Sequence, residues 1–180
     1  MPFDSASMDL EKAMGRVAET GSAVFSLQCV TGGLERHHAK RMVQFLRKHA
    51  ITELSLFRTD LGTHPDACDV VCRYIRSGCA QLHTVRMRSV MLNAGQTRHL
   101  LLTLAQHERL EEFVYDGAAL HQVTDALVAL CTQNPGLRRL DLSCEMWAFG
   151  STASLARGLA SANGTLSSSS SSSSSSVHHL

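Results

Sequence analysis

The first candidates for chemistry in this sequence are three cysteines and one histidine: Cys68, Cys72, Cys79 and His83. Thiolates and imidazoles are the usual ligands of zinc, but a tetrahedral zinc site normally contains a closer CxxC pair than any found here. Cys68 and Cys72 also fall on the apolar face of a predicted helix, whereas Cys79 falls in a turn. We therefore expect buried free thiols, with no metal site and no cofactor.

Residue combinations typical of catalysis are missing from the sequence. It contains no GxSxG elbow, and the pair Gly32-Gly33 lacks the lysine and the spacing of a phosphate-binding loop. Glu111 and Glu112 are adjacent on a predicted strand, so they point to opposite faces and cannot act together as acid and base. We expect a protein that is not an enzyme and has no catalytic residues.

A third group of side chains favours binding to a protein. Arginine and aromatic residues supply large contacts and are enriched at interface hot spots. The alternative is that Arg88 and Asp116 only pair with each other across two strands while neighbours shield Phe57. The candidate partner-binding residues are Phe57, Arg58, Arg86, Arg88, Glu112 and Asp116.

The elements that position these residues are revealed by a repeat. Residues 51–61, ITELSLFRTDL, carry apolar residues at the first, fourth, sixth and eleventh positions, and this template starts again at residues 82, 110 and 137, with a fainter copy at residue 22. Apolar quartets with the i, i+3, i+4, i+7 spacing of a helix begin at residues 10, 39, 68, 97, 123 and 152. Both series advance by 26 to 31 residues. Two patterns with one period predict a solenoid of alternating strands and helices.

The sequence predicts one solenoid domain over residues 1–166 and a disordered poly-serine tail over residues 167–180. A new repeat begins at Leu166, but ten consecutive serines follow it and have no apolar side chain to bury. Two interpretations remain open. The chain is a fragment of a longer array, or the first helix and the tail serve as makeshift caps. Self-association through an exposed terminal repeat is open as well.

Composition and charge exclude several classes of partner. The formal net charge is +1, so we expect no nucleic-acid binding through a broad basic surface. No stretch approaches the length of an apolar membrane span, and the N-terminal residues lack the features of a secretory signal. We therefore expect no membrane association and a cytoplasmic location.

The repeats of 27 to 31 residues, with local runs such as LCTQNPGLRRLDLS at residues 130–143, resemble the ribonuclease-inhibitor-like subfamily of leucine-rich repeat proteins. The resemblance covers residues 10–166. It implies an α/β fold: a right-handed curved solenoid of about five strand–helix units, with a parallel sheet on the concave side and helices on the convex side. It also implies a non-catalytic module or scaffold that binds other proteins.

Two alternatives to a binding module stay open. The family includes the Ran GTPase-activating proteins, in which a loop residue acts in trans, and Arg58 is the candidate here. The chain can also be a truncated repeat fragment without independent function. The family usually has Asn, Cys or Thr at the ninth template position, which implies differently closed loops here, because only Thr59 conforms among Val30, Thr59, Val90, Ala118 and Glu145.

In such a sheet the third, fifth, seventh and eighth template positions face solvent on the concave side. The fifth and seventh positions place Arg86 and Arg88 beside Phe57 on one side and Asp116 on the other. We therefore expect a protein partner, of unknown identity, to bind the concave sheet around these residues.

Overall fold

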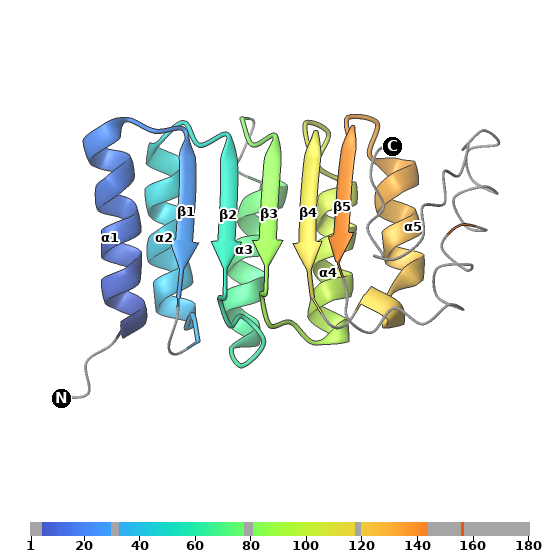
Figure 1. Ribbon diagram of the computed structural model, residues 1–180, viewed down its shortest axis with the longest axis horizontal. Coiled ribbons are helices and arrows are strands. Elements are labelled where there is room, and N and C mark those ends of the chain that lie inside the picture. The colour runs from blue at the N-terminus through green and yellow to red at the C-terminus, as the bar shows by residue number, and fades with distance from the viewer. Residues whose placement is uncertain (1–4, 30–32, 78–80, 118–119, 144–155, 157–180) are drawn as a thin grey trace.

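The structure, a computed structural model, describes residues 5–29, 33–77, 81–117, 120–143 and 156, in which helices and strands alternate (Figure 1). The helices are α1 (Ser5–Thr20), α2 (Arg36–Lys48), α3 (Pro65–Ser77), α4 (Ala94–Ala105) and α5 (Thr124–Gln133), with a short 3₁₀ turn η1 (Leu120–Gln122) before α5. The strands are β1 (Val24–Gln28), β2 (Glu53–Phe57), β3 (Thr84–Arg88), β4 (Glu112–Asp116) and β5 (Arg139–Ser143). The sixth predicted helix, apart from Ala156, and the predicted tail lie outside the described residues.

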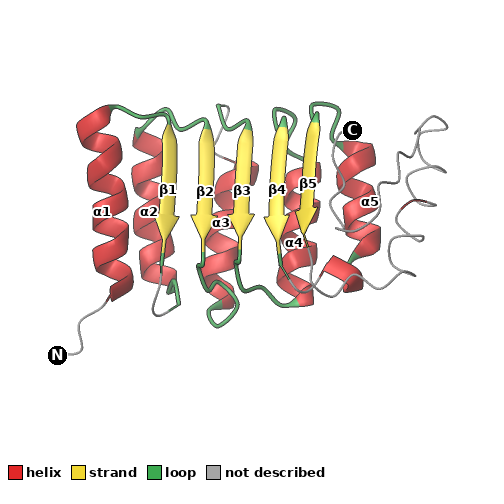
Figure 2. Cartoon of the chain, viewed as in Figure 1, coloured by secondary structure: helices red, strands yellow, loops and turns green. Residues whose placement is uncertain are grey.

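The five strands form one parallel sheet in the order β1-β2-β3-β4-β5. The sheet is open and uncurled; in Figures 1 and 2, α2, α3 and α4 lie behind the strands, α1 lies beside β1 and α5 lies beside β5. The predicted α/β repeat, in which parallel strands of one sheet alternate with helices, is therefore confirmed. We call the side of the sheet away from the helices the strand face; it corresponds to the predicted concave side. No described helix is long and apolar enough to cross a membrane.

The strands coincide with the predicted template in every described repeat. Each strand covers the third to seventh template positions, and strand pairing places equal positions side by side, as in Ser26–Ser55 and Ser55–Arg86. Successive side chains of a strand point to opposite faces, so the fourth and sixth positions point toward the helices. Leu54 and Leu56 at these positions are fully buried.

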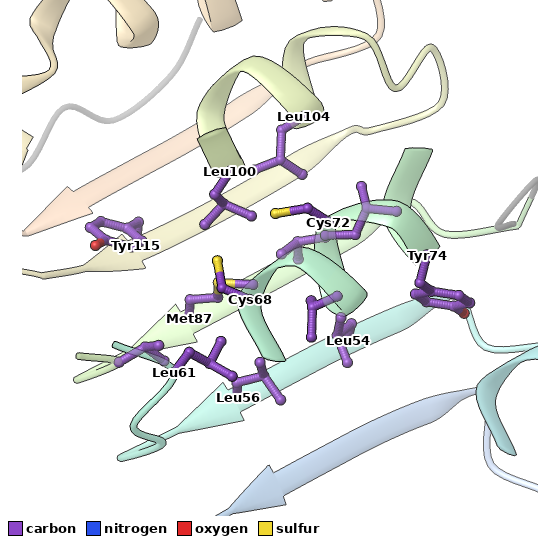
Figure 3. Packing of buried hydrophobic residues seen from close by; sticks show 14 of the residues in the cluster. Leu54, Leu56, Leu61, Cys68, Cys72, Tyr74, Met87, Leu100, Leu104 and Tyr115 are labelled. Carbon is purple, nitrogen blue, oxygen red and sulfur yellow. The ribbon is translucent and has the colours of Figure 1, made fainter. Parts of the chain in front are cut away.

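The core fills the layer between the sheet and the helices. In α3 the predicted quartet is buried and its side chains face the sheet, because the helical period places every third or fourth residue on one side. Figure 3 shows Cys68 and Cys72 of this helix in the same cluster as Leu56 of β2 and Leu100 of α4. Burial of each large side chain contributes about 1.5 to 3 kcal/mol before conformational entropy is subtracted. Each strand–helix unit therefore depends on its neighbours.

The loops that follow the strands are closed in two different ways. Thr59, at the ninth template position, is buried, and its hydroxyl donates to the carbonyl oxygen of Phe57 at 3.1 Å. Val90 occupies the same position in the next repeat and is buried as an apolar side chain instead. The other three ninth-position residues lie outside the described residues.

Asp60 closes the loop after β2 and joins it to both neighbouring loops. Its Oδ1 accepts hydrogen bonds from the backbone N–H groups of Gly62 at 2.8 Å and Thr63 at 3.0 Å. Burial acts to raise the pKa of Asp60, but the bonds from Thr63 and Gly62 outweigh it and hold this pKa below its usual value. The Asp60 carbonyl also accepts from the N–H of Leu34 at 2.8 Å, so the parallel pairing continues beyond the strands.

Two buried polar side chains connect the repeats at the opposite end of the strands. Asn134 donates through Nδ2 to the carbonyl oxygens of Leu104 at 2.9 Å and His107 at 2.8 Å, and its Oδ1 accepts from the N–H of Gly136. His107 in turn contacts the carbonyl oxygen of Leu82 through Nε2 at 2.9 Å. The Leu104 carbonyl belongs to the last turn of α4, whereas those of His107 and Leu82 lie in the loops that lead into β4 and β3.

On the helix side, an acidic and a basic side chain join each pair of neighbouring helices. These side chains are largely exposed, so each pair contributes at most about 1 kcal/mol. Three of the four pairs have the same position relative to the helical quartets. One member lies one residue after the first residue of its quartet, and its partner lies two residues after the first residue of the next quartet. The pairs are Glu11–Arg41, Arg36–Asp66 (3.4 Å), Asp69–His99 (3.8 Å) and Arg98–Asp125.

Helix α1 covers the outer edge of β1. Arg16 donates through Nη2 to the carbonyl oxygen of Ser26 at 3.0 Å, and Ser22 Oγ accepts from the N–H of Val24 at 3.1 Å. Side chains thus satisfy backbone groups that a further strand would otherwise pair with. Self-association through a terminal repeat stays a prediction.

Replacement of Asn134 by aspartate should destabilise the fold at neutral pH. The change keeps the size of the side chain but turns the donor toward two carbonyl oxygens into an acceptor, so we expect a loss of about 2 to 4 kcal/mol in the free energy of unfolding. The loss should shrink at acidic pH, because a protonated carboxyl group can donate again. Urea denaturation at pH 7 and pH 4 measures both effects.

The matched control is Gln133→Glu, one residue earlier on the exposed end of α5. It adds the same charge and should change the stability by no more than about 0.5 kcal/mol. Equal losses in the two variants would contradict a structural role for the Asn134 hydrogen bonds.

Candidate protein-binding surface

Three rows of side chains cross the strand face, because equal template positions pair from strand to strand. The third-position row is Val24, Glu53, Thr84, Glu112 and Arg139. The fifth-position row is Ser26, Ser55, Arg86, Val114 and Asp141. The seventh-position row is Gln28, Phe57, Arg88, Asp116 and Ser143. The rows divide the predicted site residues into two groups.

The first group, the Arg86 cluster, comprises Glu53, Arg86, Glu112 and Arg139. Arg86 Nη1 donates to Glu53 at 2.8 Å, and its Nε and Nη2 both donate to Glu112 Oε1 at 3.2 Å. Arg139 lies 3.7 Å from the same carboxylate oxygen. The two glutamate side chains are only 19% and 18% exposed, and that of Arg86 is 35% exposed. Two acids and two bases thus balance one another across four strands.

Arg86 and Glu112 are among the binding residues predicted from the sequence, whereas Glu53 and Arg139 are not. All four are third- or fifth-position residues, and diagonal neighbours on adjacent strands lie within reach of a long side chain. The charges in the third-position row were the signal that could have identified the cluster. Because Arg86 is held by carboxylates on both sides, it connects β2, β3 and β4.

The second group, the Phe57 cluster, comprises Phe57, Arg58, Arg88, Ser89 and Asp116 at the C-terminal ends of β2, β3 and β4. The Arg58 guanidinium carbon lies 5.2 Å from the centroid of the Phe57 ring, which is a cation–π distance. Phe57 is half-buried. The φ angle of Arg58 is +48°, a left-handed conformation that is uncommon for residues other than glycine. A GTPase-activating role for Arg58 stays a prediction.

Arg88 is exposed and lies in register between Phe57 and Asp116. The Asp116 carboxylate accepts a hydrogen bond from Ser89 Oγ at 3.4 Å. Ser89 has a φ angle of +53°, so the residue after the strand is left-handed in two successive repeats. Within the described part of the chain, no carboxylate lies within ion-pair distance of Arg88, so the expected alternative, an Arg88–Asp116 pair, is not formed.

The cysteines examined for metal binding lie in the core. Cys68 and Cys72 are buried on successive turns of α3, and their side-chain hydrogen bond, together with burial, raises the pKa of the Cys68 thiol. The same bond lowers the pKa of Cys72. His83 is half-buried, and Cys79 lies outside the described residues. The described residues include no group of three or more His, Cys, Asp or Glu side chains placed to hold a metal ion.

A hollow of about 340 Å³ lies at the N-terminal side of the last three strands, away from the Phe57 cluster. Its charged side chains are of both signs, with Glu108 and Glu111 opposed by Arg109 and Arg138. This balance favours neither an anion nor a cation, so the hollow is a weaker candidate than the strand face.

Loss of Arg86 should destabilise the sheet. Arg86→Met leaves Glu53 and Glu112 largely buried without their shared cation, so we expect the free energy of unfolding to fall by about 1 to 3 kcal/mol at pH 7. Urea denaturation at pH 7 measures it.

Arg88→Met is the control for this prediction, because Arg88 occupies the same strand and makes no described ion pair. Its effect should stay within about 0.5 kcal/mol. If both variants lose the same stability, the cross-strand role of Arg86 is wrong.

Comparison with known proteins supports the fold. No model of a known protein family matches the chain, and no curated protein matches it. Among solved structures, that of Leiomodin-1 Actin-Binding Site 2 (ABS2) is similar, with a TM-score of 0.55 and 14% sequence identity. The similarity covers 89% of this chain and 88% of the other. At this identity it concerns the fold alone, and the alternation of five parallel strands with helices is compatible with a leucine-rich repeat.

Proposed function

We propose that this protein is a non-catalytic interaction module that binds a protein partner on its strand face. One observation carries the proposal: no described helix lies in front of the strands, so the strand face is free of any described helix (Figure 2). That face combines the half-buried aromatic ring of Phe57 with exposed arginines. Rigid strands hold these groups in fixed positions, so little conformational entropy is lost on binding.

The repeat also supports a more specific assignment. We infer a leucine-rich repeat of the ribonuclease-inhibitor-like type, because the template and the helical quartets agree with the strands and helices of the fold. The cytoplasmic location inferred from the sequence fits such a module. Arrays of this kind present an extended surface built from many side chains, which suits a macromolecular partner better than a small substrate.

Actin is the first defined partner to test, because a solved structure with this fold is an actin-binding site. The 14% identity transfers the fold and not the contact residues, so actin is a probe of the proposal and not its foundation. The full chain, immobilised by one end, would be exposed first to purified actin and then to cell lysate.

A bulky charge on the strand face should abolish binding. Ser55→Arg introduces a long cation at the fifth position of β2, where the side chain is half-buried on the strand face and outside the core. We expect the captured protein to be reduced at least about tenfold, because a misplaced cation displaces contacts over a large part of the interface. Quantitative mass spectrometry measures the retained partner.

The matched control is Gln44→Arg, which adds the same side chain to the exposed side of α2. It should retain the partner in full, and circular dichroism should show both variants folded. A partner retained by Ser55→Arg and lost by Gln44→Arg would move the binding surface to the helices and refute the proposal.

A further inference from the structure

The charges of the strand face are unevenly compensated. In the Arg86 cluster the guanidinium of Arg86 contacts two carboxylates, and Arg139 lies near one of them. In the Phe57 cluster two guanidiniums, those of Arg58 and Arg88, are exposed and have no carboxylate within ion-pair distance among the described residues. The uncompensated positive charge of this face is therefore concentrated at the C-terminal ends of β2 and β3.

These two arginines are held close together by the backbone. The N–H of Arg58 donates to the carbonyl oxygen of Arg88 at 3.0 Å, so the two residues lie on directly neighbouring segments of chain. Like charges on adjacent strands repel each other, and this cost is removed when an anion lies between them. The two arginines remain adjacent although Asp116 lies on the neighbouring strand. The Asp116 carboxylate accepts a hydrogen bond from Ser89 instead of pairing with either arginine.

The conformation of Arg58 further prepares the site. Its position over the Phe57 ring restricts the guanidinium, so less rotational freedom remains to be lost on binding. Phe57 supplies a partly exposed apolar ring next to the charge. An apolar contact beside a pair of guanidiniums matches a peptide in which an acidic residue adjoins an aromatic or aliphatic one.

The rest of the strand face argues against an extended polyanion. Acidic residues lie around the two arginines: Asp116 is in the same row as Arg88, and Glu53 and Glu112 lie four positions earlier on β2 and β4. A nucleic-acid backbone carries a regular series of phosphates and would meet these carboxylates as well. A single carboxylate on a peptide can bind between the arginines without approaching these acidic side chains.

We propose that the Phe57 cluster binds an acidic segment of the protein partner, with a carboxylate between Arg58 and Arg88 and an apolar side chain against Phe57. This inference rests on the proposed function and makes it more specific, because it assigns chemistry to the partner and limits the contact to one end of the strands. Arg86 then supports the surface and does not contact the acidic group.

Synthetic peptides test the proposal directly. The probe is a fluorescein-labelled twelve-residue peptide of glycine and serine with one central Glu-Leu pair, compared with a peptide in which glutamine replaces the glutamate. Fluorescence anisotropy with the full chain should show the acidic peptide binding at least about tenfold more tightly. Its Kd should increase at least about fivefold between 50 and 300 mM salt, because screening weakens exposed charge pairs.

The variant Arg58→Gln, Arg88→Gln should lower the affinity for the acidic peptide about tenfold or more and leave the glutamine peptide unaffected. The control variant Arg47→Gln, Lys48→Gln removes the same charge from the exposed end of α2 and should bind as the unaltered chain does. Circular dichroism checks that both variants remain folded.

The outcomes separate this inference from the proposed function. Equal affinity for the two peptides, an equal loss in both variants, or tighter binding of a single-stranded oligonucleotide than of the acidic peptide would overturn the inference. If the captured partner is lost with Ser55→Arg but retained with Arg58→Gln, Arg88→Gln, the strand face remains the binding surface and the acidic contact is wrong.

Discussion

Parallel pairing in register is the constraint on which the rest of this structure depends. A single strand and helix cannot cover their own apolar side chains, so each unit is stable only when its neighbours lie alongside it. Pairing without a shift keeps the fourth and sixth template positions in the core and the third, fifth and seventh on the strand face. A shift of one residue would exchange the two sets and bury Arg86 in place of Met87. The same register therefore builds the core and assembles the binding surface.

The fold could be predicted well from the sequence because both periodicities, the strand template and the helical quartets, consist of apolar residues. The template identified each strand, and the quartets identified each described helix, since burial depends mainly on which side of an element a residue occupies. The loops were harder. Asp60 closes its turn with a carboxylate at the tenth template position, and the buried amide of Asn134 connects two repeats. Such bonds depend on the exact approach of backbone atoms, which spacing alone does not reveal.

The candidate site was predictable in position and less so in chemistry. The rows on the strand face follow from the register, so the neighbourhood of Phe57, Arg88 and Asp116 could be derived from the sequence. The choice of ion-pair partner could not, because Arg86 reaches diagonally to Glu53 and Glu112 and not straight across the strands. The left-handed backbone of Arg58 also has no signature in residue type. Long side chains have several partners within reach, and the geometry decides among them.

The acid–base pairs between helices give the array a fixed internal order. Asp69 of α3 faces His99 of α4, and Arg98 of α4 faces Asp125 of α5. If recombination removed the α4 unit, Asp69 and Asp125 would become neighbours at matching positions and two carboxylates would repel each other. Duplicating or deleting one repeat therefore meets a charge mismatch on the helix side, however similar the apolar template. The units share one architecture, but the charges at these positions differ from unit to unit, so each unit pairs only with particular neighbours.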